Sequence, residues 1–242
     1  MTLIIPHFNQ FSYCLHLIAW WNLYVPGAKI IISDNGSTIE VLRKFTQLKL
    51  AFPNLVVVPW ETNEMRLNLE RTITEYVPDD YYFISNPDIL PAPGIPENFI
   101  DILKHCIDEE GYNRAGFALR INDLPDHYPH KADVIAWEKQ FWRNLRTIHY
   151  RETEHYSAYL AALDLSLCLY SKVNGGWKSK SDGWGNSIRM FDAIHWQWYE
   201  RADSTLPEVA LYNSTCLGPA DGKMKGVNHW NPDKPLDEML KA

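Results

Sequence analysis

The stretch YYFISNPD, residues 81–88, joins a run of aromatic and apolar side chains directly to a polar end that contains a proline. Short apolar runs of this kind are typical of strands buried in a parallel sheet. Three further runs precede it, at residues 3–5, 29–33 and 55–58. Helical patterns separate these runs, at residues 10–24, 38–51 and 63–77. Strands that alternate with helices predict right-handed crossovers and a mostly parallel sheet flanked by helices, which is an α/β fold.

The pattern changes in the second half of the chain. Two helices and a strand are expected there, at residues 96–109, 133–143 and 115–120. Residues 156–170 predict one or two strands, antiparallel to the first sheet, and residues 173–187 predict a loop rich in Gly, Ser and Lys. No internal repeat or low-complexity tract divides the sequence, so we expect one domain over residues 1–242.

The composition is that of a globular protein, with 46% hydrophobic and 22% charged residues. There are 23 Lys and Arg against 30 Asp and Glu, and the formal net charge is -7. Because an acidic chain lacks the broad basic surface of a duplex-binding protein, we expect no nucleic-acid partner. The four cysteines are far apart, a spacing that favours neither a zinc site nor a disulfide framework.

The first residues show no basic segment followed by an apolar run, which is the pattern of a signal peptide. No apolar stretch approaches the length of about 20 residues that a membrane-spanning helix needs. We therefore expect no transmembrane segment and a cytoplasmic location.

Polar side chains follow the second and fourth predicted strands. Asp34 and Asn35 end the second, while Asn86 and Asp88 end the fourth. Because the carboxyl ends of parallel strands meet at one edge of a sheet, these residues are expected to lie at the same edge, where ligands bind. Asp34 either caps the next helix or binds the base or ribose of a nucleotide. Asp88 either forms a turn or supplies a hard oxygen to Mg²⁺ or Mn²⁺ bound to a diphosphate.

Two common nucleotide-binding motifs are absent from the sequence. No GxGxxG follows the first predicted strand, and no GxxxxGK[ST] occurs anywhere. A nucleotidyltransferase usually carries a Gly-rich basic loop after its first strand, where this chain has PHFNQ at residues 6–10. The sequence therefore argues against a dinucleotide-binding protein, a P-loop enzyme and a nucleotidyltransferase.

Three segments together, LIIPHFN, IIISDNGS and YYFISNPD, resemble the GT-A fold of nucleotide-sugar glycosyltransferases. The resemblance covers residues 2–92 and is closest to compact, single-domain enzymes of the family-2-like kind, which also occur in phages and large DNA viruses. It implies that residues 1–92 bind a nucleotide-sugar and that residues 93–242 bind the acceptor. It also implies donor contacts from a set of residues at the strand ends and on the third helix, namely Pro6, His7, Phe8, Asp34, Asn35, Arg66 and Asn86. For Arg66 a solvated helix face is the alternative.

The same family holds a divalent metal with a D-x-D motif. Here Asp88 occupies the last position of the motif, and Asn86 replaces the first Asp. The segment FDAIHWQWY, residues 191–199, is similar to a stretch in compact relatives whose His returns to the metal. The resemblance therefore implies a Mn²⁺ or Mg²⁺ ion held by Asp88 and His195. A core histidine is the alternative for His195.

A general base is implied by the segment AALDLSLCLY, residues 161–170. It is similar to the A-I-D stretch of some inverting GT-A enzymes, which makes Asp164 the catalytic base. A structural hydrogen bond is the alternative role for this Asp. Glu138 is the competing base, and Asp133 is the third candidate. Lys178, Lys180 and Arg189 are candidates to neutralise the diphosphate, or belong to a solvated loop.

The predicted function is therefore a metal-dependent hexosyl- or pentosyltransferase. It would move a sugar from a UDP- or GDP-linked donor to a hydroxyl of a glycan or glycoprotein acceptor, with inversion at the anomeric carbon. A carbohydrate-binding protein or an inactive glycosyltransferase relative is the alternative, and Asn86 is its main support.

Overall fold

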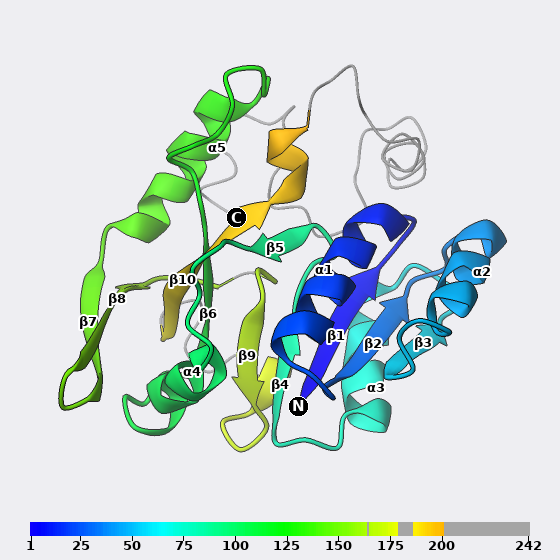
Figure 1. The fold of residues 1–242 in the computed structure, drawn as a ribbon, viewed down its shortest axis with the longest axis horizontal. Coiled ribbons are helices and arrows are strands. Elements are labelled where there is room, and N and C mark those ends of the chain that lie inside the picture. Colours follow the sequence, from blue (N-terminus) through cyan, green and yellow to red (C-terminus); the bar gives the residue numbers. More distant parts are fainter. Residues whose placement is uncertain (164, 179–185, 201–242) are drawn as a thin grey trace.

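The structure is a computed structural model that describes residues 1–163, 165–178 and 186–200. One mixed sheet runs through this part of the chain, with strand order β3-β2-β1-β4-β9-β6-β10-β8-β7, and β5 pairs with β10 beside this path (Figure 1). The predicted α/β fold class is confirmed.

The first half of the sheet is parallel. Its strands are β1 (Thr2–His7), β2 (Lys29–Asp34), β3 (Leu55–Pro59) and β4 (Tyr81–Ile84). The connecting helices are α1 (Phe11–Tyr24), α2 (Ile39–Leu48) and α3 (Met65–Tyr76). The predicted alternation of strands and helices is confirmed here.

The second half contains more elements than the sequence pattern predicts. Its helices are α4 (Phe99–Asp108) and α5 (Lys131–Glu138), with short 3₁₀ turns η1 (Lys139–Trp142), η2 (Gly176–Lys178) and η3 (Trp196–Tyr199). Its strands are β5 (Ile89–Pro91), β6 (Arg114–Leu119), β7 (Leu145–Arg151), β8 (Glu154–Leu160), β9 (Cys168–Ser171) and β10 (Ser187–His195). The sequence predicts one or two strands between residues 156 and 170; two are present, β8 and β9, and β9 is antiparallel to β4. The sequence pattern missed β5, β7 and β10.

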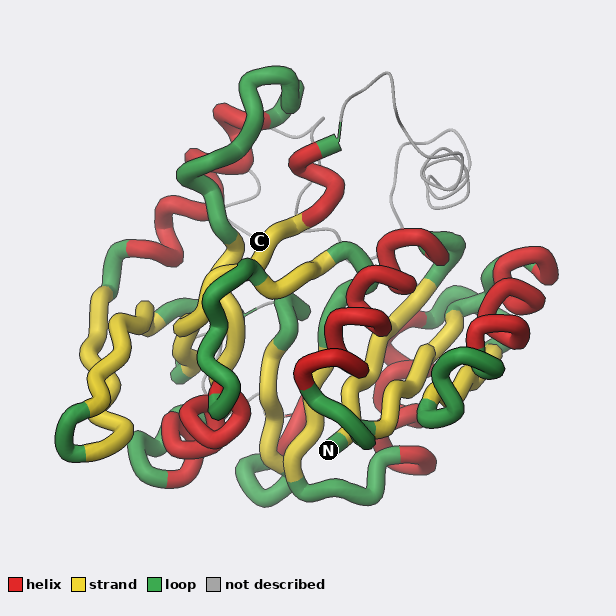
Figure 2. Tube along the Cα trace, in the orientation of Figure 1, coloured by secondary structure: helices red, strands yellow, loops and turns green. Residues whose placement is uncertain are grey.

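Alternation along the strands divides the interior into two apolar layers. Leu3 and Ile5 of β1 point to the face covered by α1 and α2, and they share a core cluster with Trp21 and Phe45. Ile4 points to the opposite face, where it packs in a second cluster with Leu69 of α3. Figure 2 shows these helices against the strands of the first half. In the described part of the chain, no helix has the length and apolar character needed to cross a membrane.

A close backbone approach joins β6 to the start of β9. A Cβ atom added to Gly116 would lie 2.8 Å from the Leu167 carbonyl oxygen and 2.9 Å from the Cys168 Cα. Leu167 itself has a positive φ of 56°, an uncommon conformation for a branched side chain. The segment before β9 is therefore held tightly against β6, with no room for a methyl group at Gly116.

Gly116→Ala is expected to lower the free energy of unfolding by about 1–3 kcal/mol, because backbone atoms must move to admit the methyl group. Urea unfolding at equilibrium measures the change. Gly27→Asn is a matched control, since a Cβ atom there meets nothing within 4 Å and Asn tolerates its positive φ. An equal decrease in the free energy of unfolding in both variants would contradict the packing argument.

Candidate active site

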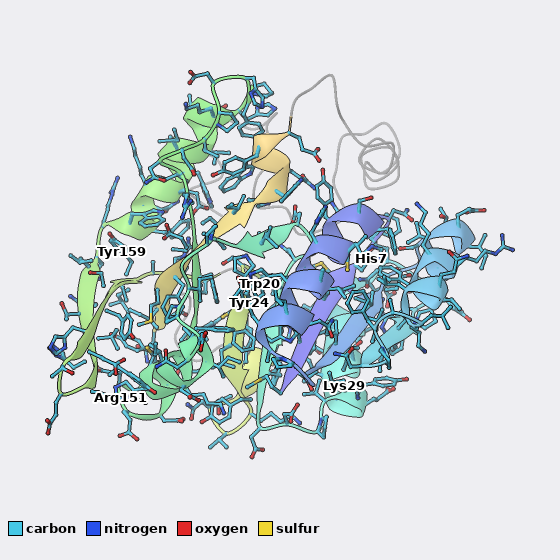
Figure 3. All side chains as sticks on the ribbon, viewed as in Figure 1. His7, Trp20, Tyr24, Lys29, Arg151 and Tyr159 are labelled. Carbon is cyan, nitrogen blue, oxygen red and sulfur yellow. The ribbon has the colours of Figure 1, made fainter. Side chains whose placement is uncertain are left out.

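The ends of β1 and β2 form a buried polar pair. The register places His7 opposite Asp34, and His7 Nδ1 donates to Asp34 Oδ2 over 2.8 Å. The Gln10 backbone N–H donates to His7 Nε2 over 3.1 Å, so the ring carries its proton on Nδ1. Figure 3 labels His7 between α1 and α2. Both side chains of the pair have no exposed surface, so their geometry is fixed by the protein.

Asp34 also binds the loop that follows it. Its two oxygens accept hydrogen bonds from the Ser37 backbone N–H at 2.9 Å and from the Ser37 hydroxyl at 2.5 Å. Burial raises the pKa of the Asp34 carboxyl, but the hydrogen bonds from His7 and Ser37 outweigh it, so the net pKa lies below the ordinary value. Asp34 is therefore ionised at neutral pH and has three hydrogen-bond donors from the protein.

The side chain of Asn35 extends this network. Its Nδ2 donates to the carbonyls of His7 and Ser33 at 3.2 and 3.1 Å, and its Oδ1 accepts from Asn68 Nδ2 at 2.9 Å. Asn35 and Asn68 are both almost fully buried. Asp34 and Asn35 therefore shape the loop after β2, and a contact between them and a nucleotide stays a prediction.

The loop after β1 is fastened to the same network. Pro6 is buried, Phe8 is half-buried, and Asn9 has a positive φ of 53°. The Asn9 side-chain oxygen accepts from the Thr38 backbone N–H at 3.0 Å, and the Asn9 backbone N–H donates to the Ser37 hydroxyl at 2.9 Å. Asn9 and Ser37 were missed as site residues. Their signal in the sequence is a short polar residue two or three positions after a strand, a type that tolerates positive φ or caps a helix.

Arg66 does not join these residues. Its side chain is 61% exposed and forms an ion pair with Glu70, one turn further along α3, at 3.4 Å. The structure places it on a solvated helix face, which is the alternative given for it above.

The two residues predicted to bind a metal lie together, although they are far apart in sequence. β5 pairs with the end of β10 so that Ile89 faces His195, and the Trp196 N–H donates to the Asp88 carbonyl at 2.8 Å. Asp88 Oδ2 lies 3.5 Å from His195 Nε2. Asp88 is 7% exposed.

Stacked rings fix the orientation of this histidine. The His195 ring stacks on Trp198 with centroids 4.5 Å apart and planes at 4°. Trp196, between them in sequence, stacks on His16 of α1 at 4.9 Å. His195 Nδ1 is buried and has no hydrogen-bond partner among the described residues. The ring is thus held by stacking, with its Nε2 directed to Asp88.

This pair has the chemistry of a divalent cation site. Two ligands about 2.1 Å from one ion lie about 3–3.5 Å apart, which accommodates the observed separation. The carboxylate oxygen suits both Mn²⁺ and Mg²⁺, and the imidazole nitrogen is tolerated better by Mn²⁺ than by Mg²⁺. In the described part of the chain, no third His, Cys, Asp or Glu completes a cluster. The residues fit an ion whose other positions are filled by water or by oxygens of a ligand.

Asp164 lies outside the described residues, but its neighbours in sequence are anchored at this edge. The Leu165 carbonyl accepts from the Asn86 N–H at 2.7 Å. The Ala162 carbonyl accepts from Arg189 Nε at 2.6 Å. The chain on either side of Asp164 is therefore tied to β10 and to the segment that carries Asp88.

Glu138 and Arg189 form a buried ion pair. Arg189 Nη1 donates to Glu138 Oε2 at 3.0 Å, and the two side chains are 3% and 6% exposed. The guanidinium also lies 4.1 Å from the centre of the Phe141 ring. These contacts favour a structural role for Glu138. They also bind the Arg189 guanidinium to groups of the protein itself. Lys180 and the side chain of Lys178 lie outside the described residues, and Asp133 is in the first turn of α5.

Comparison with known proteins gives the fold. No protein-family model and no curated protein sequence matches the chain. A mannosyltransferase from Pyrobaculum calidifontis, solved with GDP-Man and Mn²⁺, matches 81% of the chain with a TM-score of 0.52 and 11% identity. GalNAc-T7, solved with UDP, GalNAc and Mn²⁺, matches 80% of it with a TM-score of 0.53 and 12% identity. The chain spans about half the length of these proteins, 56% and 43%. Both are GT-A-type glycosyltransferases, and the fold of this chain is the GT-A fold.

The lowered pKa of Asp34 has a consequence for stability. A carboxyl whose pKa is lower in the folded state stabilises it above the unfolded pKa, near 3.8, and this contribution is lost as the pH falls below that value. Asp34→Asn is expected to lower the free energy of unfolding by about 2 kcal/mol at pH 7, because hydrogen bonds to a charged group are lost, and by less at pH 3. Urea unfolding at both pH values measures this difference. Asp80→Asn, an exposed carboxylate in the bend before β4 and outside any helix, is the control. A loss in Asp34→Asn that is the same at both pH values would contradict the assignment.

Proposed function

We propose that the chain is a metal-dependent glycosyltransferase that moves a sugar from a nucleoside-diphosphate sugar to an acceptor hydroxyl. The observation that carries the proposal is the pairing of Asp88 with His195 at the carboxyl edge of a GT-A sheet. In open α/β sheets this edge is where ligands bind. The two structural neighbours, one with GDP-Man and one with UDP, both contain Mn²⁺ and support the same class of donor.

In this proposal Asp88 and His195 hold the cation and the strand ends hold the nucleotide. The bound Mn²⁺ or Mg²⁺ supplies positive charge that stabilises the departing diphosphate. Pro6 and His7 end β1 and Phe8 begins the loop that follows, beside Asp34 and Asn35, so the nucleotide would meet a strand end and a loop already fixed by hydrogen bonds. Residues 1–92 would form the donor half and residues 93–242 the acceptor half.

Asp164 is proposed as the general base. Its carboxylate would take the proton of the acceptor hydroxyl while that oxygen bonds to the anomeric carbon and the bond to the diphosphate breaks, which inverts the anomeric configuration. The anchoring of Ala162 and Leu165 supports this role, because it ties the flanking chain to Arg189 and Asn86. A UDP- or GDP-linked hexose or pentose is the proposed donor, and a glycan or glycoprotein is the proposed acceptor.

The second candidate is an inactive relative or a carbohydrate-binding protein. Asn86, in place of the first acid of the D-x-D motif, is the observation that favours it. Asn supplies only a neutral oxygen, which lowers the negative charge of the site. Metal-dependent nucleotide binding and turnover separate this candidate from the enzyme.

Calorimetric titration with UDP and with GDP, in the presence and absence of Mn²⁺, tests the donor site. We expect Mn²⁺ to tighten the binding of one nucleotide at least about 10-fold, since the ion bridges protein and diphosphate. Asp88→Ala should remove this gain. Asp101→Asn, with its carboxylate on the exposed surface of α4, should keep it. If Mn²⁺ strengthens the binding of neither nucleotide, the proposed function is wrong.

Product detection across common nucleotide-sugars, followed by kinetics with the active donor, tests the base. Asp164→Asn is expected to lower kcat by about 10²–10⁴-fold while nucleotide binding is retained. Glu138→Ala should instead lower the free energy of unfolding by about 3 kcal/mol, because it leaves Arg189 buried without its carboxylate. The base would be Glu138 instead if Asp164→Asn keeps full turnover and Glu138→Gln folds normally but loses turnover.

A further inference from the structure

Two histidines face each other on the hairpin of β7 and β8. The antiparallel register places His149 directly opposite His155. Their Nδ1 atoms form a hydrogen bond of 3.0 Å, and the ring centroids are separated by 4.7 Å with the planes at 70°. Both side chains are exposed to solvent. The pair therefore presents two imidazole nitrogens at one point on the surface.

The pattern of the hairpin explains why the rings meet. Ile148 and Ala158 are buried, so alternation along each strand turns their neighbours to the outer face. His149 and His155 occupy that outer face on adjacent strands, where directly opposed side chains are in reach of each other. Among the described strands β7 is the last of the sheet, at the opposite end from β3, and Figure 3 labels Arg151 on this hairpin. The pair is thus separate from the Asp88–His195 site.

We propose that His149 and His155 form a binding site for a late divalent transition metal, of the Cu²⁺ or Ni²⁺ class. Two nitrogen ligands about 2.1 Å from one ion and at a right angle to each other lie about 3.0 Å apart. The observed separation of the Nδ1 atoms matches this spacing. An ion would replace the proton that the two nitrogens now share, and the rings would turn from their mutual hydrogen bond toward it. The Irving–Williams order, in which Cu²⁺ binds more tightly than Zn²⁺, favours this class over Zn²⁺. Imidazole also suits Cu²⁺ and Ni²⁺ better than the oxygen-seeking Mg²⁺ and Mn²⁺.

The surrounding charges permit a cation at this position. Arg151, the nearest basic residue along β7, is paired with Glu154 at 3.2 Å, and the Tyr156 hydroxyl donates to the same carboxylate at 3.1 Å. The positive charge of Arg151 is therefore balanced within the hairpin. In the described part of the chain no third ligand joins the two histidines, so water completes the coordination and the ion exchanges with solvent.

A bound ion would join the edge strand to its neighbour. The hairpin meets the rest of the sheet through the short pairing of β8 with β10, at Leu160 and Tyr159. An ion held by one residue from each strand binds only the paired hairpin, and by mass action it stabilises that state. The site does not depend on the proposed sugar transfer.

Calorimetric titration of the full chain with Ni²⁺, in buffer without chelating groups, tests the site, and the copper signal in electron paramagnetic resonance gives the number of nitrogen ligands. We expect the tightest Ni²⁺ site to bind at least about 10-fold more weakly in either His149→Asn or His155→Asn, because each variant removes one of its two ligands. The copper spectrum should show coupling to two nitrogens in the wild type and a changed pattern in both variants.

Two control variants separate this site from other histidines. His127→Gln removes an exposed histidine elsewhere, and His195→Gln removes the one in the proposed active site; both should keep the tight Ni²⁺ ion. Unchanged Ni²⁺ affinity in a variant that carries both His149→Asn and His155→Asn would overturn the proposal. A loss of Ni²⁺ affinity in His127→Gln as large as the loss in His149→Asn would also overturn it. Tighter binding of Zn²⁺ than of Ni²⁺ and Cu²⁺ would overturn the assigned class of metal.

Discussion

The pairing of β5 with β10 is the constraint on which the candidate site depends. It is a backbone interaction, three residues long, that sets Ile89 against His195 and lets the Trp196 N–H reach the Asp88 carbonyl. Because side chains alternate along a strand, a slip of one residue would turn the histidine to the other face. Asp88 and His195 are therefore brought together by strand register, and the stack on Trp198 then fixes the ring.

A second constraint acts on the parallel half of the sheet. A buried carboxylate costs free energy unless hydrogen bonds replace its water, and Asp34 obtains them from His7 and Ser37. These bonds connect the loops after β1 and β2 before any ligand is present. A loop fixed in this way loses little conformational entropy on binding, which is the physical advantage of a preorganised site. The cost is that Asp34 and Asn35 have fewer free groups to offer a ligand.

The fold of the first half was predictable because its signals are local. Four apolar runs with helices between them determine a parallel sheet, and that topology alone places Asp34 and Asp88 at one edge. In the second half, β5 has only three residues, and β10 includes the charged residues Arg189 and Asp192. Such strands exist because of partners far away in the sequence, so no local pattern indicates them.

The same distinction applies to the site residues. The residue types of Asp88 and His195 indicated a metal, and their juxtaposition followed from long-range pairing that the sequence does not show. Glu138 and Arg189 were each interpreted singly, one as a base and one as a charge for the diphosphate. Only the fold reveals that they bind each other at 3.0 Å in the interior. A titratable residue whose type suits catalysis can instead have a structural role when the fold buries it beside an oppositely charged partner.

The replacement of an acid by Asn86 can be understood through the charge of the proposed site. A carboxylate ligand contributes one negative charge and an imidazole ligand contributes none, so a divalent ion held by Asp88 and His195 would keep net positive charge. A second carboxylate would cancel that charge and weaken the attraction to a diphosphate. The Asn86 site would therefore hold the free ion weakly and the ion together with its nucleotide more tightly. Because such coupling is reciprocal, the ion and the nucleotide would each strengthen the binding of the other by the same factor.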